Sequence, residues 1–175
     1  MVKTTDRQRW KKIKANCKSI NSQALTTSPL NSRQIISILK CSPHFIGCFA
    51  EDRLTNLNLL NYPVLLLTNV DASNLPGSHW IALYITKTTL EVFDPLGFKF
   101  YKWSRIPCKL FSFLHLHSIN RKLIFSKTVQ SQSSKLCALF CIFYVLTRPF
   151  FSLKTIESFF SSHLNKNDEK LIKLF

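Results

Sequence analysis

The sequence QSQSSKLCALFCIFY, which runs from Gln130 to Tyr144, passes directly from polar, turn-forming residues into a long apolar run. Cys137 lies at the junction. If the apolar run is a helix, Cys137 lies in its first turn, where unpaired backbone N–H groups and the positive end of the helix dipole favour a thiolate. A thiolate at the start of a helix is a nucleophile that needs a base nearby. We predict a helix over residues 135–146 that is apolar on nearly every face and therefore buried on most sides.

Two strands joined by a tight turn come earlier in the chain. Residues 79–86 are β-branched and aromatic, Lys87-Thr88 forms the turn, and residues 90–94 form the next strand. In a hairpin about this turn, residues whose numbers sum to about 174 face each other, so His79 falls near position 95, beside Asp94. The hairpin therefore predicts an imidazole next to a carboxylate, which is the orienting pair that a nucleophilic site requires.

The remaining elements follow from apolar periodicity and turn signals. We expect helices at 31–40, 106–116, 153–163 and 168–174, and strands at 63–69 and 123–129. The segment 45–50 is interpreted as a buried turn. This order predicts an α+β fold, in which a mixed central sheet packs on a buried helix that carries Cys137 at its N-terminus, with further helices around it.

Length and composition indicate one folded domain with an arm. The chain has 175 residues, 46% of them hydrophobic and 13% aromatic, which is enough to bury a substantial core. We place a basic, flexible N-terminal arm at 1–30 and the folded domain at 31–175. The arm has seven Lys and Arg residues against one acid, Asp6. It is interpreted as an electrostatic tether, and a ragged terminus without a role is the alternative.

The charge is strongly positive and unevenly distributed. The formal charge is +15, and between Asp94 and Glu157 the chain has ten Lys and Arg residues and no acid. This predicts a broad positive face that attracts polyanions, nucleic acid above all, and a basic protein without a binding role is the alternative. A membrane surface fits less well, because the basic residues do not follow one amphipathic helix. The candidate contacts to DNA phosphates are Lys99, Lys102, Arg105, Lys109, Arg121, Lys122 and Lys127.

The six cysteines, at positions 17, 41, 48, 108, 137 and 141, form no Cys-x-x-Cys pair and have no matching His spacing, so we expect no metal site. The N-terminus lacks the apolar segment of a secretory signal. The longest apolar run has 11 residues, too few to span a bilayer. Free thiols in an intracellular, reducing compartment are the expectation.

A cysteine nucleophile also needs donors for the oxyanion that forms during attack. Gln130, at the end of a predicted strand and seven residues before Cys137, is the candidate side-chain donor, and Gln132 in the loop is a less favoured alternative. Each candidate alone has a structural explanation, such as a core cysteine or a turn-opening Asp94. The ordered set of His79, Asp94, Gln130 and Cys137 is harder to obtain by chance.

The chain also resembles the adenain family, which comprises the adenovirus endopeptidase and its relatives in adintoviruses and Polinton/Maverick elements, within the clan of ubiquitin-like-protein proteases. The similarity covers roughly residues 32–175. It lies mainly in four sequences: FIGCFAEDRL from Phe45, PGSHWIA from Pro76, FDPLG from Phe93, and Gln130 followed by CALFC from Cys137. The C-terminal NDEKLI from Asn167 is similar to the Polinton-type members.

The resemblance implies a role for each matching residue. His79 would be the general base, Asp94 its orienting acid, Cys137 the nucleophile and Gln130 the oxyanion-hole residue. Trp80 would border a narrow tunnel that selects glycine, and a core aromatic is the alternative. Where the family usually has Gly after the nucleophile, this chain has Ala138, which is compatible with a helical first turn.

By the same resemblance the protein would be a viral or virus-like-element cysteine endopeptidase that cleaves virion precursor proteins at Gly-x-Gly type sites. DNA would be a cofactor, and a basic viral peptide would be a second activator, with Cys108 as a candidate for its disulfide. We expect a monomer in the virion and the host nucleus, with a capsid or core precursor as its partner and no membrane contact. Two alternatives stay open: a deconjugating protease for a ubiquitin-like modifier, and a non-catalytic, DNA-binding virion protein.

Overall fold

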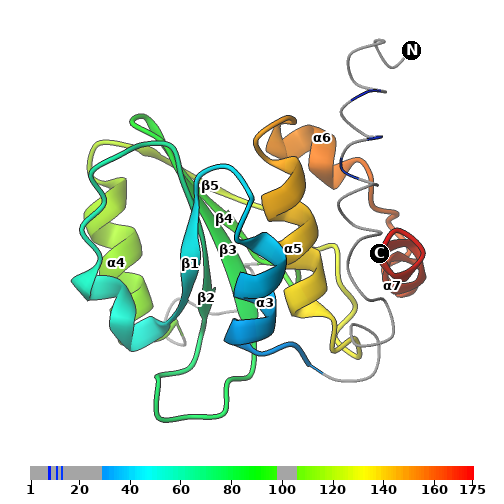
Figure 1. Cartoon of the computed structure of the whole chain (residues 1–175), viewed down its shortest axis with the longest axis horizontal. Helices are drawn as coiled ribbons and strands as arrows, with labels where there is room; N and C mark the ends of the chain where they lie inside the picture. The colour runs from blue at the N-terminus through cyan, green and yellow to red at the C-terminus, as the bar shows by residue number, and fades with distance from the viewer. Residues whose placement is uncertain (1–7, 9–10, 12, 14–28, 98–105) are drawn as a thin grey trace.

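A five-stranded mixed sheet forms the centre of the protein in the computed structural model, which describes residues 8, 11, 13, 29–97 and 106–175 (Figure 1). The three middle strands are antiparallel neighbours, whereas each edge strand pairs in parallel with its neighbour. The α+β fold with a mixed sheet is thereby confirmed. In spatial order, which is also chain order, the strands are β1 (Phe45–Ala50), β2 (Val64–Asn69), β3 (Trp80–Ile85), β4 (Thr89–Phe93) and β5 (Lys122–Phe125).

Helices cover both faces of this sheet (Figure 1). On one face lie α4 (Cys108–Ser118) and the 3-10 helix η1 (Glu51–Asn56). On the other face lie α3 (Ser32–Leu39) and α5 (Cys137–Thr147), with α6 (Leu153–Glu157) and α7 (Asn165–Ile172) farther from the sheet. The strands serve both layers because alternate side chains point to opposite faces. In β2, for example, Leu65 and Leu67 join the core beneath α5, while Leu66 joins the core beneath α4.

Helix α5 is the buried helix that the sequence predicts, and all eleven of its residues are buried. Tyr144 stacks on Phe93 of β4, with ring centroids 4.5 Å apart and planes 10° apart. The Cys141 thiol donates a hydrogen bond to the carbonyl of Trp80, with Sγ 3.3 Å from the oxygen. These contacts fix the helix against the middle of the sheet, so the position of its first residue, Cys137, is set by the whole core.

Helix α3 begins where the sequence predicts. Asn31 caps α3 and accepts a hydrogen bond from the Gln34 backbone, while the Gln34 side chain accepts from the Asn31 backbone, which is a complete capping box. The helix predicted at 106–116 is α4 and lies two residues later, at Cys108–Ser118. Its first turn has no side-chain cap of its own, and the Glu51 carboxylate of η1 accepts from the Lys109 and Leu110 backbone instead.

One prediction is wrong near the start of the sheet. The segment expected to be a buried turn is strand β1, which pairs in parallel with β2. Gly47 has φ of 141°, and the pairing shifts register between Phe45 and Gly47. A parallel edge strand depends on a crossover to a distant partner, in this case through η1, and so leaves little local signal.

The C-terminal helices differ from their predicted bounds. The helix expected at 153–163 ends at Glu157, and the one expected at 168–174 begins earlier, at Asn165. The reason is a side-chain interaction: Asn167 Oδ1 accepts a hydrogen bond from the Ser161 backbone at 2.8 Å, which draws this segment out of a continuing helix. Both helices remain, but the loop between them is structured by Asn167.

Parts of the predicted arm contact the domain. Of the residues in 1–30 that the structure describes, Ile13 and Leu30 are buried in the core beneath α5. The Leu30 carbonyl also accepts a hydrogen bond from Trp80 Nε1 at 3.2 Å. Leu30 therefore belongs with the folded domain. Among the described helices, none has the length and apolar character needed to cross a membrane.

Candidate active site

The β3–β4 hairpin brings His79 and Asp94 together. Its register pairs Ala82 with Phe93, a sum of 175 rather than the predicted 174, because the turn closes with Thr86 donating its N–H to the carbonyl of Thr89. His79 precedes β3 and Asp94 follows β4, so both side chains lie just beyond the paired segment. His79 Nε2 is 2.8 Å from Asp94 Oδ1, and both residues are buried. The predicted imidazole–carboxylate contact is present.

A closed loop positions His79. The Val70 N–H donates to the His79 carbonyl, which ties the two ends of residues 70–79 together. Asn69 Oδ1 accepts from the Asp71 and Ser78 backbone N–H groups at 3.0 and 3.3 Å. Sequence reasoning missed this role of Asn69, although an Asn that opens a loop rich in Gly, Pro and Ser is a signal for such a turn.

Glycine is required at one point of this loop. Gly77 has φ of 85°, in the left-handed region, and a Cβ there would lie 2.8 Å from Asn69 Nδ2. The side chain that closes the loop therefore occupies the space that any larger residue at position 77 needs.

A neighbouring segment holds Asp94. Ser126 Oγ accepts from the Asp94 N–H at 2.9 Å and donates to the Asp94 carbonyl at 3.0 Å. The Leu96 N–H donates to Asp94 Oδ1, the same oxygen that contacts His79. Asp94 Oδ2 is buried and has no hydrogen-bond partner in the described part of the chain. Sequence reasoning missed Ser126, because only the parallel pairing of β4 with β5 brings it to Asp94.

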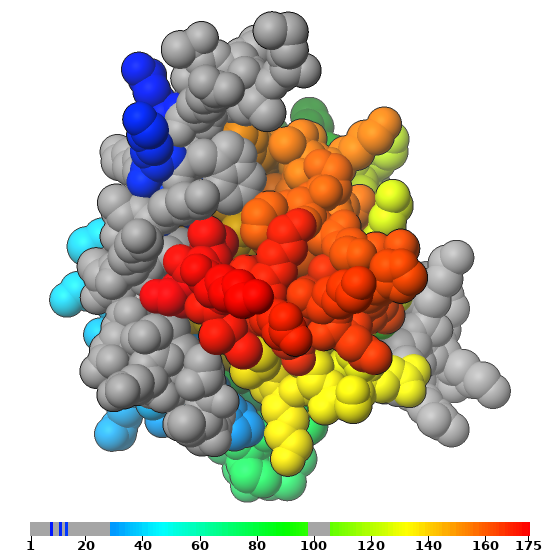
Figure 2. Space-filling view, turned by 90° about the vertical axis from the view of Figure 1, so that its right-hand side faces the viewer, coloured from blue at the N-terminus to red at the C-terminus, as the bar shows by residue number. Residues whose placement is uncertain are grey.

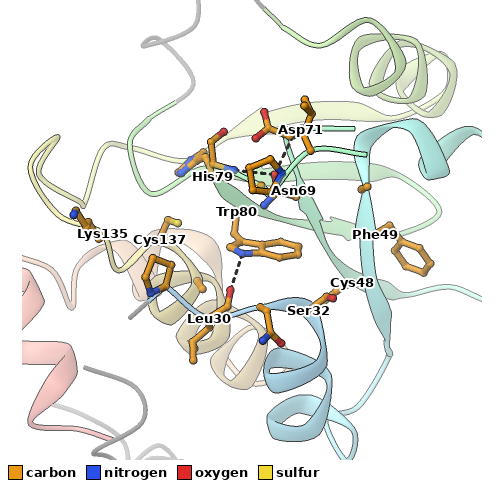
Figure 3. Close-up of a pocket in the computed structure, with 18 of the residues that line it drawn as sticks. Leu30, Ser32, Cys48, Phe49, Asn69, Asp71, His79, Trp80, Lys135 and Cys137 are labelled. Carbon is orange, nitrogen blue, oxygen red and sulfur yellow. Dashed lines mark hydrogen bonds between the residues drawn. The ribbon is translucent and has the colours of Figure 1, made fainter. Parts of the chain in front are cut away.

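Cys137 is the first residue of α5, which begins two residues later than predicted, so Cys137 lies in the first turn as expected. Leu136 precedes it as the N-cap, and no side chain among the described residues caps the helix start. The Cys141 hydrogen bond to Trp80, one turn along, turns this face of the helix toward the start of β3. Cys137 consequently lies beneath His79 at the edge of the cleft (Figure 3).

The electrostatics of His79 follow from these neighbours. Burial disfavours the charged ring, but hydrogen bonds to Asp94 and Cys137 outweigh it and raise the pKa of His79 to about 9. At neutral pH the imidazole is therefore protonated. Asp94 uses Nε2, which leaves Nδ1 for Cys137. The Cys137 thiol thus lies at a helix N-terminus with a cationic ring beside it, the kind of environment in which reactive cysteines occur.

A cleft of about 760 Å³ opens over these residues, lined by His79, Trp80, Gln130 and Cys137 together with the 70–78 loop and the start of α3 (Figure 3). Trp80 forms part of the wall, and its indole is held by the Leu30 carbonyl. Cys48, at the far side, is a second thiol on the wall, and burial raises the pKa of Cys48 to about 12. Cys48 therefore stays protonated and differs from Cys137 in its surroundings.

Gln130 lies on the cleft wall as expected, but its amide is engaged. Nε2 donates to the carbonyl and to the hydroxyl of Ser134, at 3.0 and 3.1 Å. Its Oε1 is buried, with no hydrogen-bond partner in the described residues. Gln132, the alternative, lines the same cleft and is exposed. In this arrangement the N–H groups at the start of α5 are the donors that the helix itself leaves available.

The predicted DNA-binding residues fall into three groups. Lys99, Lys102 and Arg105 lie outside the described residues. Lys109, Lys122 and Lys127 are exposed. Arg121 is partly buried: its Nε donates to the Thr86 carbonyl, its Nη1 donates to the His117 carbonyl, and its guanidinium lies 4.8 Å from the Tyr62 ring centroid.

No cluster of three or more His, Cys, Asp or Glu residues suited to a metal ion occurs in the part of the chain that the structure describes.

Comparison with known proteins gives a match to one family model and similarity to several solved structures. The family model described as adenovirus endoprotease matches residues 45–172. No curated protein sequence matches the chain. Among solved structures, SUMO protease Ulp1 with its catalytic cysteine oxidised to a sulfinic acid is 16% identical, with 99% of this chain and 94% of that chain covered and a TM-score of 0.44. AvrA delL154 with IP6 and CoA is 11% identical, with 91% of this chain and 66% of that chain covered and a TM-score of 0.47.

Proposed function

This chain belongs to the adenovirus endoprotease family and is a cysteine peptidase, and from that premise we propose that it is a viral or virus-like-element endopeptidase that cleaves virion precursor proteins at Gly-x-Gly type sites. The observation that carries the proposal is the placement of His79 between Asp94 and Cys137: His79 Nε2 is 2.8 Å from buried Asp94 Oδ1, and His79 lines the same cleft as Cys137, which lies at a helix N-terminus. These three residues are proposed as the catalytic group.

In the proposed mechanism, the Cys137 thiolate attacks the carbonyl carbon of the scissile peptide bond. The carbonyl oxygen becomes an oxyanion, which the backbone N–H of Cys137, at the start of α5, stabilises. When the intermediate collapses, the C–N bond breaks and protonated His79 gives its proton to the leaving amine. Neutral His79 then takes a proton from water, which attacks the thioester and releases the acid, while Asp94 keeps the ring oriented throughout.

The role of Gln130 is a separate part of the proposal. Its Nε2 is proposed as a second oxyanion donor, which requires at least one of its two hydrogen bonds to Ser134 to be exchanged for the substrate oxygen. Trp80 is proposed to border the subsite that accepts glycine, because its indole forms part of the cleft wall.

The test is cleavage of matched substrates. Peptides with a Gly-x-Gly sequence are compared with peptides carrying Ala in place of each Gly, and with a fusion to a ubiquitin-like modifier. We expect cleavage of the first group alone. Cleavage restricted to the modifier fusion would assign the protein to deconjugation. Cleavage of neither, with a protein that still binds DNA, would favour the non-catalytic virion protein.

DNA is proposed as a non-specific activator, since positive charge without acidic neighbours attracts phosphates. We expect the rate to rise with DNA and the effect to fade between about 50 and 200 mM salt. Replacing exposed Lys122 or Lys127 with Glu should weaken the response, whereas Lys173→Glu, at the exposed C-cap of α7, serves as the matched control. Equal rates with and without DNA at both salt concentrations would remove this part of the proposal.

A basic viral peptide is proposed as a second activator, with exposed Cys108 as its candidate disulfide partner. A Cys108→Ser variant that responds to such a peptide like the parent would exclude this cysteine. By its family we propose a monomer that acts in the virion and the host nucleus on a capsid or core precursor.

A further inference from the structure

Helix α7 lies behind the active-site loop that joins β5 to α5. Figure 2 shows the red C-terminal residues directly beside the yellow segment around residue 130. The link between them is Asn167, which is 0% exposed. Its Nδ2 donates to the Val129 carbonyl at 2.8 Å and to the Ser161 carbonyl at 3.0 Å, and its Oδ1 accepts from the Ser161 N–H at 2.8 Å. Every polar atom of the side chain is used, so its position is fully determined.

The same loop is held from the opposite side by the residue after Asp94. The N–H groups of Val129 and Gln130 both donate to the Pro95 carbonyl, at 2.8 and 2.9 Å. The Val129–Gln130 backbone is therefore clamped between Pro95 on one side and Asn167 on the other. Gln130 follows the clamped carbonyl directly, and its side chain reaches the cleft that contains Cys137.

Helix α7 meets the loop at a second point, Ser134. Burial raises the pKa of the neighbouring Asp168, and a hydrogen bond with Ser134 acts in the opposite direction. Ser134 Oγ is also the acceptor for Gln130 Nε2 and for the Leu136 N–H, at 3.1 and 3.2 Å. Two consecutive residues of α7 thus contact the segment that leads to Cys137, Asn167 at Val129 and Asp168 at Ser134.

We propose that Asn167 is a positioning residue for the peptidase reaction. By holding the Val129 carbonyl it fixes the backbone of Gln130, and thereby the placement of the oxyanion donors relative to Cys137. This inference rests on the proposed catalytic roles of Cys137 and Gln130. Its consequence is that α7, which supplies no group to the cleft, is a working part of the active site.

The test replaces Asn167 with Asp, which keeps the shape and the acceptor but removes both N–H donors. The matched control is Asn165→Asp, which makes the same change in charge on the same helix at an exposed position. We expect Asn167→Asp to lower kcat about 10- to 100-fold with KM within about twofold, because small misplacements of reacting groups have effects of this size. Alkylation of Cys137 by iodoacetamide should stay within about twofold, since His79 and Asp94 are untouched.

Hydrogen exchange of residues 126–136 gives a readout independent of activity. We expect faster exchange there in Asn167→Asp than in Asn165→Asp. Unchanged exchange, kcat equal to the control in folded protein, or parallel loss of cleavage and alkylation would each overturn the inference. Asn167→Gln, which keeps donor and acceptor on a longer arm, is judged by the same criteria if Asn167→Asp does not fold. A parent protein that cleaves no peptide refutes the proposed function, while the exchange result still decides whether Asn167 orders the loop.

Discussion

Strand β4 and the residue after it supply two buried carboxylates, and helix α5 meets them at its opposite ends. Glu91 faces the C-terminal end, where it accepts hydrogen bonds from Tyr144 Oη at 2.8 Å and from Arg148 Nε and Nη2 at 2.7 Å each. Asp94 faces the N-terminal end, where it meets His79. Both Glu91 oxygens have partners, whereas Asp94 Oδ2 is buried with none in the described residues.

The difference separates a structural ion pair from a reactive one. Burial raises the pKa of Tyr144, so its hydroxyl stays protonated as a donor to Glu91, and the Arg148 guanidinium also lies 4.2 Å from the Tyr84 ring centroid. Both carboxylate oxygens of Glu91 already accept hydrogen bonds within the protein, so this network is not arranged to bind a ligand. The His79 ring, by contrast, has one nitrogen on Asp94 and the other beside Cys137, at an open cleft. The same pair of elements thus carries a fully paired ion pair at one end and the proposed catalytic group at the other.

The largest expected effect is on the reactive end. Cys137→Ala removes the proposed nucleophile, so kcat/KM for a Gly-x-Gly peptide should fall by about 10⁴-fold or more. The free energy of unfolding in urea should change little, because Cys137 is at the rim of the core. Cys41→Ala, at an exposed cysteine outside the cleft, is the control and should remain active. Peptide cleavage that survives Cys137→Ala would remove Cys137 as the nucleophile.

Glu91→Ala should have the opposite effect to Cys137→Ala, with a large loss of stability and little loss of activity. It leaves the partly buried Arg148 without its partner, so the protein should lose about 3–5 kcal/mol of unfolding free energy, measured in urea. Activity per folded molecule should stay within a few fold. The double variant Glu91→Leu with Arg148→Met should recover part of the stability, because no unpaired charge remains. Lost activity at unchanged stability would contradict the division between the two ends.

The largest change of stability between pH 6 and 9.5 should come from His79, at the reactive end. The folded-state pKa of His79, about 9, lies above its ordinary value of 6.5, so its contribution is fully present below about pH 6.5 and is lost as pH rises toward 9. The difference corresponds to roughly 3 kcal/mol. Urea unfolding from pH 6 to 9.5 should show this loss in the parent and a flatter profile in His79→Gln, which has the same cysteines. Identical slopes in the two proteins would contradict the raised pKa.

The smallest effect concerns the residue after the nucleophile. Ala138 is 4% exposed in the first turn of α5. Ala138→Gly, the residue that the family usually has here, should cost up to about 1 kcal/mol of unfolding free energy, since Gly is a poorer helix former. We expect kcat/KM to stay within about threefold. A rise of tenfold or more would mean that the Ala138 methyl group obstructs substrate.

Much of the reactive end was predictable because its signals are local. The hairpin places His79 beside Asp94 from turn position alone, and the change from polar to apolar residues marks the start of α5 at Cys137. The features that the sequence did not predict depend on contacts between distant segments. Strand β1 needs β2, Ser126 reaches Asp94 through β5, and Asn167 holds a carbonyl 38 residues away. The hydrophobic periodicity of a sequence does not show which distant segments will be in contact.

The sequence also could not show that the side-chain amide of Gln130 donates its hydrogen bonds to Ser134. Spacing places the residue near Cys137, and the structure agrees. Whether its Nε2 faces the cleft or Ser134 depends on the folding of a loop of polar residues, each of which can form several turns. Residue type and spacing predict which residues belong to a site. They predict less well in which direction the hydrogen-bond donors of those residues point.

The late position of α5 in the chain has a consequence for synthesis. The core that α5 completes contains the sheet residues Leu65, Leu67, Ala82 and Phe93. During synthesis on the ribosome, their side chains therefore stay uncovered until residues 137–147 have been made. At roughly 5–20 residues per second, this interval lasts several seconds. A chain released after Gln130 should bind a dye such as ANS and be digested quickly by protease, whereas the full chain should do neither. The helix that carries the proposed nucleophile is therefore also the segment that covers the apolar face of the sheet. Until α5 has been synthesised, that face is exposed to aggregation and to proteolysis.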